Sequence, residues 1–301
     1  RAISGRAWSK LLLGDISAAT ELAKEYNRIE IAGIAETIQY GTGRQRLAYN
    51  QNSDPFSLLI ATNQIAELAN AVIRTRGIVL ESIMVESRID GLAGGEDRLR
   101  AERLRNLRGA VGEMLLSDPE RAIKLQSEIN EILTDLSGTH PALVSLNAIR
   151  EVSLFNVQSR IGKSEAVLEF IRYRTLETTG KFTQRYGALV LQRDVAPKWK
   201  SLGLATEVDD LVGAFNPIMQ ESPAGTSEAD FLDLSSRLYN LLLLPLEEEI
   251  GNAVSLRIVP ESSLGLLSFG VLADRESRLA LEKWDVSYLV SSRDMLKEEV
   301  T

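Results

Sequence analysis

The spacing of apolar residues predicts that the first part of the chain is helical. From Ala7 to Tyr26, apolar side chains recur at mixed three- and four-residue intervals, which is typical of half-buried helices. Gly14 and Asp15 interrupt this pattern and predict a turn between two helices, because Asp15 is suited to capping the second helix. A further apolar set follows over residues 28–38.

The same helical spacing continues through the middle of the chain. Apolar positions over residues 56–92 fit one long helix, and residues 96–116 predict a charged helix with leucine and valine along one side. Another helix is expected to start after Ser117 or Asp118 as its cap. Pro119 then occupies the first helical turn, where proline is tolerated.

Strand character begins close to Gly162. Residues 166–176 and 186–194 are rich in β-branched and aromatic side chains, which favours strands over helices. We predict that they form an antiparallel pair joined by the polar loop 177–185. Residues 197–203 are expected to add a short third strand.

Helices and strands both follow this pair. A helix is predicted over Ala205–Met219 and a second one ending near Ile250, and strands are predicted over residues 255–260 and 284–290. The expected fold class is therefore α plus α/β, with a helical region over residues 1–162 and an α/β region over residues 163–301.

Composition narrows the class of protein. The chain has 301 residues, of which 44% are hydrophobic and 25% charged, as in an ordinary folded protein. Its net charge of −8 disfavours a whole-surface affinity for nucleic acid or anionic lipid. The most apolar run, Leu241–Leu244, is far shorter than a membrane span, and no signal peptide is recognisable. Because the chain opens with Arg1 rather than Met, we expect it to be part of a longer protein.

The absence of cysteine excludes several chemistries from this chain. Without cysteine there are no disulfides, thiolate zinc sites or thiol nucleophiles. The single histidine, His140, stands in a turn before a proline, with no second histidine nearby. A lone loop histidine lacks the base and orienting group that catalysis requires. We therefore predict no catalytic residue, no metal ligand and no cofactor-binding residue in the chain.

The sequence contains one cluster of arginines and one run of glutamates. Five arginines fall within the predicted helix over residues 96–116, interleaved with Glu96, Asp97 and Glu102, so we expect a solvated or domain-contact face; they are Arg98, Arg100, Arg103, Arg105 and Arg108. The alternative, binding of nucleic acid, requires a one-sided basic stripe. For the acidic run Glu247–Glu249 we expect a helix end that faces water.

Glycine and serine motifs also lack the spacing of known sites. The loops at residues 41–46 and 91–96 do not have the glycine spacing that cradles phosphates, so turn formation is their expected role. Ser262, Ser263, Ser291 and Ser292 lack the GxSxG pattern of a nucleophile elbow. The sequence therefore offers no convincing reaction centre.

A series of short motifs in the second half resembles a known family. Pro245-Leu246-Glu247 ends a predicted helix, Val259-Pro260-Glu261 ends a predicted strand, Ser268-Phe269 follows, and residues 287–296 read SYLVSSRDML. The series is similar to the PLE, VPD, PF and YLpSgRdLL elements of CHAT domains, the caspase-like domains that occur in bacteria with tetratricopeptide repeats. The serines around Leu264 and Gly265, and Ser268 itself, depart from the family's usual residues.

The resemblance extends upstream and covers roughly residues 41–296. Residues 166–174, 186–194 and 199–215 are similar to the first strands and helix of a CHAT domain, and residues 43–49 and 71–82 to the helical segment that precedes it. We expect a tetratricopeptide-like character in the helical region on this ground, although no second copy recurs at a fixed 34-residue period.

The family's catalytic pair, a histidine followed by glycine and a later cysteine, would lie beyond the YLpSgR segment and is not in this chain. The resemblance thus implies a regulatory or scaffold portion of a bacterial cytoplasmic cysteine endopeptidase. Its expected partners are the remaining catalytic part of the CHAT domain and a protein partner or effector complex on the helical region. Neither a membrane nor direct nucleic-acid contact is expected. The alternative is a non-enzymatic adaptor or pseudoprotease that recruits a protein partner through its helices.

Overall fold

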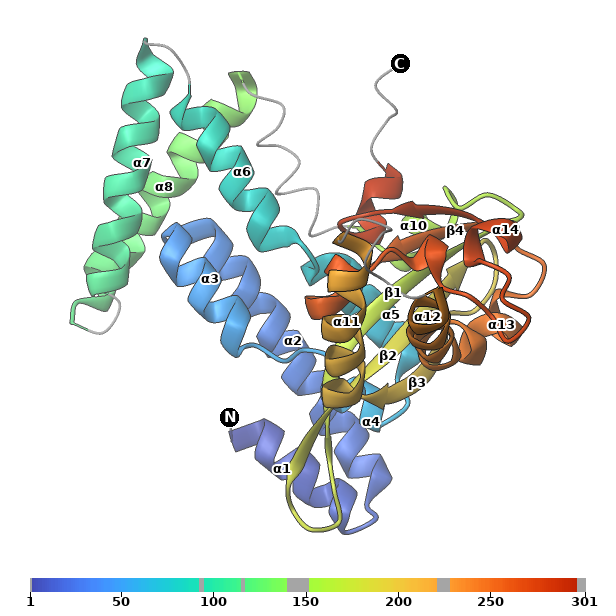
Figure 1. The fold of residues 1–301 in the computed structure, drawn as a ribbon. Helices are drawn as coiled ribbons and strands as arrows, with labels where there is room; N and C mark the ends of the chain where they lie inside the picture. The colour runs from blue at the N-terminus through green and yellow to red at the C-terminus, as the bar shows by residue number, and fades with distance from the viewer. Residues whose placement is uncertain (1, 92–94, 115–116, 140–151, 221–227, 297–301) are drawn as a thin grey trace.

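The computed structural model describes residues 2–91, 95–114, 117–139, 152–220 and 228–296. Figure 1 shows a helical first half and a second half built around one sheet, which confirms the predicted α plus α/β class. The helices of the first half are α1 (Ala2–Leu12), α2 (Ile16–Tyr40), α3 (Gly43–Asn52), α4 (Ser57–Ala61), α5 (Ile65–Thr75), α6 (Ile78–Asp90), α7 (Glu96–Met114), α8 (Pro119–Thr139) and α10 (Leu154–Gln158).

The second half alternates strands with short and long helices. Its strands are β1 (Glu165–Leu176), β2 (Phe182–Gln192), β3 (Lys198–Leu204), β4 (Ser255–Val259) and β5 (Asp285–Tyr288). Its α-helices are α11 (Ala205–Gln220), α12 (Glu228–Leu242), α13 (Glu247–Ile250) and α14 (Ala280–Lys283), and short 3₁₀ turns η2 (Leu244–Leu246), η3 (Ser262–Leu266), η4 (Phe269–Val271) and η5 (Ser292–Leu296) complete it.

The five strands form one mixed sheet in the order β3-β2-β1-β4-β5. β1 and β2 pair antiparallel, as predicted, and β3 adds to β2 as the predicted third strand. β4 and β5 run parallel to β1. Alternate side chains of β1 point to opposite faces, so Leu168 and Phe170 join one core while Val167 and Ile171 join another.

Both faces of the sheet are covered by helices. α11 and α12 cover the face that carries Phe170, and α1, α2, α4, α5 and α10 contribute to the core on the opposite face. Helices from the first half therefore share a hydrophobic core with the strands of the second half. α6, α7 and α8 pack together through a separate cluster, and α7 and α8 lie away from the sheet in Figure 1.

Local signals at helix ends behave as the sequence predicts. The carboxylate of Asp15 accepts a hydrogen bond from the backbone N–H of Ala18, and Asp118 does the same for Arg121. Gly14 has a φ of +77°, which favours glycine in the turn between α1 and α2.

The predicted single helix over residues 56–92 is wrong. The structure has three helices there, α4, α5 and α6, separated by breaks at residues 62–64 and 76–77. Asn63 has a φ of +57° and Gly77 a φ of +69°, a left-handed backbone conformation that ends a helix. The apolar period passes through both breaks because each helix buries a face, α4 and α5 in the core against the sheet and α6 in separate clusters of the helical region. Among the described helices, none is long and apolar enough to cross a membrane.

Candidate functional site at the carboxyl edge of the parallel strands

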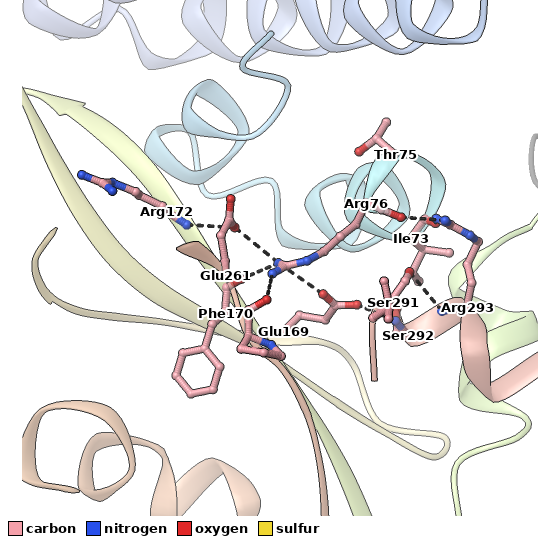
Figure 2. A network of polar contacts seen from close by, with 12 residues as sticks. Ile73, Thr75, Arg76, Glu169, Phe170, Arg172, Glu261, Ser291, Ser292 and Arg293 are labelled. Atoms are coloured by element: carbon pink, nitrogen blue, oxygen red, sulfur yellow. Dashed lines mark hydrogen bonds and ion pairs between the residues drawn. The ribbon is translucent and has the colours of Figure 1, made fainter. Parts of the chain in front are cut away.

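Two parallel strands, β4 and β5, end at one edge of the sheet beside Glu169 of β1, and β1 itself continues to Leu176. Glu169 of β1 pairs with Val259 at the end of β4, and Ile258 pairs with Tyr288 at the end of β5. In open α/β sheets, this carboxyl edge is where ligands bind most often. Figure 2 shows that the break between α5 and α6 lies at the same edge, with the side chain of Arg76 directed at β1 and at the segment after β4.

Gly77 allows the break between α5 and α6 to approach the turn that follows β5. A Cβ atom built on Gly77 would lie 3.4 Å from Cγ1 of Val290 and 3.8 Å from Cβ of Ser291, at a φ of +69°. A side chain at position 77 would therefore meet backbone strain, whereas its Cβ would make ordinary van der Waals contacts with this turn. Glycine keeps residues 76–77 seated against this turn.

Arg76 connects the helical region to two strands. Its guanidinium donates hydrogen bonds to the backbone oxygen of Phe170 in β1 and, at 2.7 Å, to that of Pro260 after β4. The same Nη1 atom lies 3.4 Å from a carboxylate oxygen of Glu169 and 3.4 Å from one of Glu261. One nitrogen atom of this side chain thus lies close to two carboxylates. The guanidinium as a whole contacts both β1 and the segment after β4.

Glu169 is a carboxylate in the middle of the sheet. Its side chain is 0% exposed, within a run of buried apolar residues in β1. One carboxylate oxygen accepts a hydrogen bond of 2.9 Å from the backbone N–H of Ser292, and the other faces Arg76. Because a buried carboxylate is costly without partners, these two contacts tie α5 and the segment after β5 to the centre of the sheet.

Glu261 lies at the opposite side of the Arg76 guanidinium. Its carboxylate accepts a hydrogen bond of 3.2 Å from the backbone N–H of Arg172. Burial raises the pKa of Glu261 above its ordinary value, although the charge of Arg76 acts in the other direction. Arg76 is therefore the main neighbour that favours the ionised form of this carboxyl group.

Arg293 fastens the segment after β5 to the end of α5. Its guanidinium donates to the backbone oxygens of Ile73 and, at 2.6 Å, of Arg76, and lies 3.4 Å from Glu81 of α6. These oxygens belong to the last turn of α5, where helical partners run out, so Arg293 caps that helix from outside. The side chain is 5% exposed. We refer to Arg76, Glu169, Glu261, Ser292 and Arg293 as the edge network.

A large cleft adjoins the edge network. It has a volume of about 1070 Å³ and lies between α1, residues 50–57, the β1–β2 hairpin and residues 260–262. Arg174 and Asp54 form an ion pair of 2.7 Å on its wall. The indole N–H of Trp8, which also lines the cleft, is buried and has no hydrogen-bond partner among the described residues. The cleft thus has the size and mixed polarity of a binding site.

The serines considered from the sequence lie at this edge or beside it. Ser262 lines the cleft, and the hydroxyl of Ser263 donates to Asp209. The Oγ of Ser291 accepts a 3.3 Å hydrogen bond from the backbone N–H of Arg293, and Ser292 acts through its backbone N–H. In the part of the chain that the structure describes, none of these serines has an imidazole beside it, because His140 lies outside the described residues.

The five arginines of α7 divide into two groups. Arg98, Arg100 and Arg103 lie on the surface and pair with carboxylates of α7 or α8. Arg108 is buried and contacts Glu86 of α6. Arg105 lines a hollow beside Arg108. The expectation of a mixed solvated and contact face agrees with these positions.

The acidic run forms α13 and is only partly exposed to water. Glu248 is exposed, but Glu249 lies 3.4 Å from Lys200 and Glu247 lies 3.0 Å from Lys283. The water-facing helix end expected for this run is thus wrong for two of its three residues, because lysines from β3 and α14 reach it.

Lys283 also contacts Asp274, at 3.0 Å. Burial alone raises the pKa of a carboxyl group, but the backbone N–H of Arg278, the ammonium of Lys283 and the backbone N–H of Glu276 hold the pKa of Asp274 well below its ordinary value. This ion cluster anchors α14 to α13 and to the segment that follows η4.

The glycine loops form turns where they are described. Thr42 and Gln45 make reciprocal capping contacts at the start of α3, as expected of turn chemistry. The second loop includes residues 92–94, which lie outside the described residues. Among the described residues, no group of three or more potential ligands could hold a metal ion.

Arg76 and Glu169 were not singled out from the sequence, although both lie within the stretches that carry the CHAT resemblance. Glu169 carries a readable signal, because it is the one charged residue in the run AVLEFI of a predicted buried strand. For Arg76 the only signal is weak: a glycine follows it inside a pattern that otherwise predicts a helix.

No family model matches the chain, and a comparison with curated proteins found no match either.

Proposed function

We propose that this chain is the regulatory and scaffold part of a cysteine endopeptidase of the CHAT type, with its histidine and cysteine supplied by sequence outside residues 1–301. The observation that carries the proposal is the open edge of the sheet. β5 pairs only with β4 among the described strands, and Tyr288 at its end is 46% exposed. A parallel strand edge of this kind is suited to receive a further strand from the catalytic part.

The edge network supports a regulatory role for the helical region. Arg76 and Arg293 connect the break between α5 and α6 to the middle of β1 and to the segments that follow β4 and β5. A partner that moves α5 or α6 would therefore shift the segments after β4 and β5, next to the open edge. The proposal includes activation by a protein partner or ligand on the helices, and a bacterial cytoplasmic location, as the resemblance implies.

The test starts with the coding DNA beyond the codon for Thr301. The proposal expects an in-frame continuation with a His-Gly pair and a later cysteine at a strand end. Residues 1–301 alone should not cleave unfolded casein, and the chain with its continuation should do so once activated. A matched variant with that cysteine changed to alanine should be inactive. Cleavage by residues 1–301 alone, at a rate independent of contaminating proteases, would defeat the proposal.

A second candidate function is a non-enzymatic adaptor. The cleft of about 1070 Å³ favours it, because such a cleft can hold a segment of a partner protein without any reaction. A continuation without the His-Gly and cysteine pair, together with a partner lost on Trp8→Ala, would support the adaptor.

A further inference from the structure

The amino edge of the sheet lies opposite the edge network and brings the ends of four strands together. β1 begins there and β2 ends there, since Ala166 pairs with Gln192, and β4 begins beside Glu165. Lys198 begins β3 at the same edge. Because neighbouring strands lie about 4.8 Å apart, these strand ends span roughly 15 Å.

The segments that lead into and out of these strands are held against one another. Nε2 of Gln158, on α10, donates a hydrogen bond of 2.8 Å to the backbone oxygen of Gln192 and another to that of Val195. On the other side of β1, the backbone N–H of Val254 donates 2.8 Å to the backbone oxygen of Ser164. The segments before β1, after β2 and before β4 therefore form one continuous surface, which we call the amino-edge surface.

Apolar side chains are exposed on the amino-edge surface. Phe155 is 75% exposed, Val254 62% and Val195 42%. Phe155 lies two positions before Val157, which is buried in the core, so α10 packs through one side and presents Phe155 on the other. A single exposed apolar residue is common, but a group of them bordered by charged residues is typical of an interaction site.

Positive charge surrounds these apolar side chains. Arg160, Lys163 and Lys198 are exposed, and none of them forms an ion pair with another residue in the part of the chain that the structure describes. A fourth cation, Arg193, lies 3.7 Å from its neighbour Asp194. In a chain with a net charge of −8, this edge thus carries a local excess of positive charge.

We propose that the amino-edge surface binds a segment of a partner protein in which carboxylates flank a large apolar side chain. The carboxylates would meet Arg160, Lys163 and Lys198, and the apolar side chain would cover Phe155. Complementary charge of this kind steers association and selects the partner. Asp285, exposed at the start of β5, would repel carboxylates and limits the site on that side.

An anionic membrane and nucleic acid fit this surface less well. The net charge of −8 opposes the approach of either polyanion. α10 has five residues and exposes one large apolar side chain, Phe155, so it offers little apolar area to a lipid surface. The amino-edge surface lies at the opposite edge of the sheet from the edge network, and its role does not depend on the peptidase proposal.

Fluorescence anisotropy tests the amino-edge surface in the purified chain. The probe is a fluorescein-labelled peptide of about twelve residues in which Glu and Asp alternate with Leu and Phe. We expect saturable binding with half-saturation below about 1 mM, weakened at least about fivefold when the salt concentration rises from roughly 0.05 to roughly 0.5 M. A peptide with Gln and Asn in place of the acids should bind at least about tenfold more weakly.

Charge reversal locates the binding on the surface of the folded chain. Lys163→Glu combined with Lys198→Glu should weaken binding of the acidic peptide at least about tenfold. The matched control combines Lys124→Glu with Lys181→Glu, two exposed positions on α8 and on the β1–β2 loop, and should change the affinity less than about twofold. Phe155→Ser should weaken binding at least about threefold. All of these side chains are exposed, so each variant should keep the circular dichroism spectrum of the parent chain.

Several outcomes would overturn the proposal. They are absence of saturation by the acidic peptide below about 1 mM, equal losses in the two charge-reversed pairs, and unchanged binding by Phe155→Ser. Vesicles of phosphatidylserine and phosphatidylcholine, and single-stranded DNA, are the competing probes. Tighter binding of either one, lost on Lys163→Glu with Lys198→Glu, would replace the proposal with a membrane or nucleic-acid site. Loss of peptide binding in a longer chain that includes the in-frame continuation would show that the surface is an internal contact, which also overturns the proposal.

Discussion

Replacement of Arg76 by alanine tests the edge network at its centre. The substitution removes the guanidinium that faces Glu169 and Glu261, and it leaves the backbone oxygens of Phe170 and Pro260 without this donor. The arginine side chain is 10% exposed and that of Glu169 is 0% exposed, so water cannot readily take the place of the lost partner.

The expected loss is large because a buried charge is left uncompensated. Breaking a buried ion pair by removing one partner typically costs about 3–5 kcal/mol of the free energy of unfolding. A single neutral hydrogen bond contributes about 1 kcal/mol. Arg74→Ala provides the matched control, since Arg74 lies in the last turn of α5, two residues before Arg76, and donates a hydrogen bond of 3.2 Å to the backbone oxygen of Val152.

Equilibrium unfolding in urea, followed by far-ultraviolet circular dichroism, measures both losses. We expect Arg76→Ala to lower the free energy of unfolding by about 3–5 kcal/mol and Arg74→Ala to lower it by about 1 kcal/mol. In a Glu169→Gln background, Arg76→Ala should cost at least about 1.5 kcal/mol less, because no buried charge remains at position 169.

Two results would refute this reasoning. One is a loss for Arg76→Ala no greater than the loss for Arg74→Ala. The other is a coupling between positions 76 and 169 below about 0.5 kcal/mol, which is the size expected for residues without a shared interaction.

Three further predictions concern neighbouring parts of the fold. Gly77→Ala should lower the free energy of unfolding by about 1–2 kcal/mol, whereas Gly109→Ala inside α7 should raise it by up to about 1 kcal/mol; urea unfolding with the same sign for both would contradict this. The pKa of Asp274 is lowered from 3.8, so its stabilisation is complete at neutral pH and lost as the pH falls below about 4; Asp274→Asn should lower the melting temperature more at pH 7 than at pH 3, and equal losses would count against the lowered pKa. Phe269→Ala should cost about 3–5 kcal/mol because Phe269 is 0% exposed, and Leu266→Ala less than about 0.5 kcal/mol because Leu266 is 71% exposed; similar losses would show that this segment is not packed as described.

The sequence was sufficient to predict the elements whose signals are local. The antiparallel pair of β1 and β2 has β-branched and aromatic residues in two runs joined by a polar turn, and the structure confirms that pairing. The caps at Asp15 and Asp118 were equally predictable, because an N-cap side chain acts on its own first turn.

The edge network was not predictable from local pattern. Arg76 and Glu261 are far apart in the chain and meet only because β4 lies beside β1 and the break between α5 and α6 reaches the end of β4 next to the middle of β1. The break itself was missed because the apolar period of α5 and α6 reports burial, and both helices bury a face. A single glycine within a helical pattern of apolar residues is only a weak sign of a helix break. The contact of Gly77 with Val290, which explains the break, is visible only in the structure.

Buried charges in the helical region were missed for a related reason. Arg46 belongs to a stretch that was predicted to form a turn, and Arg108 to a helix that was predicted to present a solvated or domain-contact face. Burial of the two around Glu86 follows from the packing of α3 against α6 and α7, which no spacing within one helix reveals.

Hydrogen exchange measured by mass spectrometry tests most directly whether the helical region and the carboxyl edge are coupled. The comparison is between the parent chain and Arg76→Lys, which keeps the charge but loses the guanidinium fork. The account predicts faster exchange not only near residues 73–77 but also over residues 290–294, because the N–H of Ser292 bonds to Glu169, the partner of Arg76. Faster exchange confined to residues 73–80, with residues 290–294 unchanged, would contradict it.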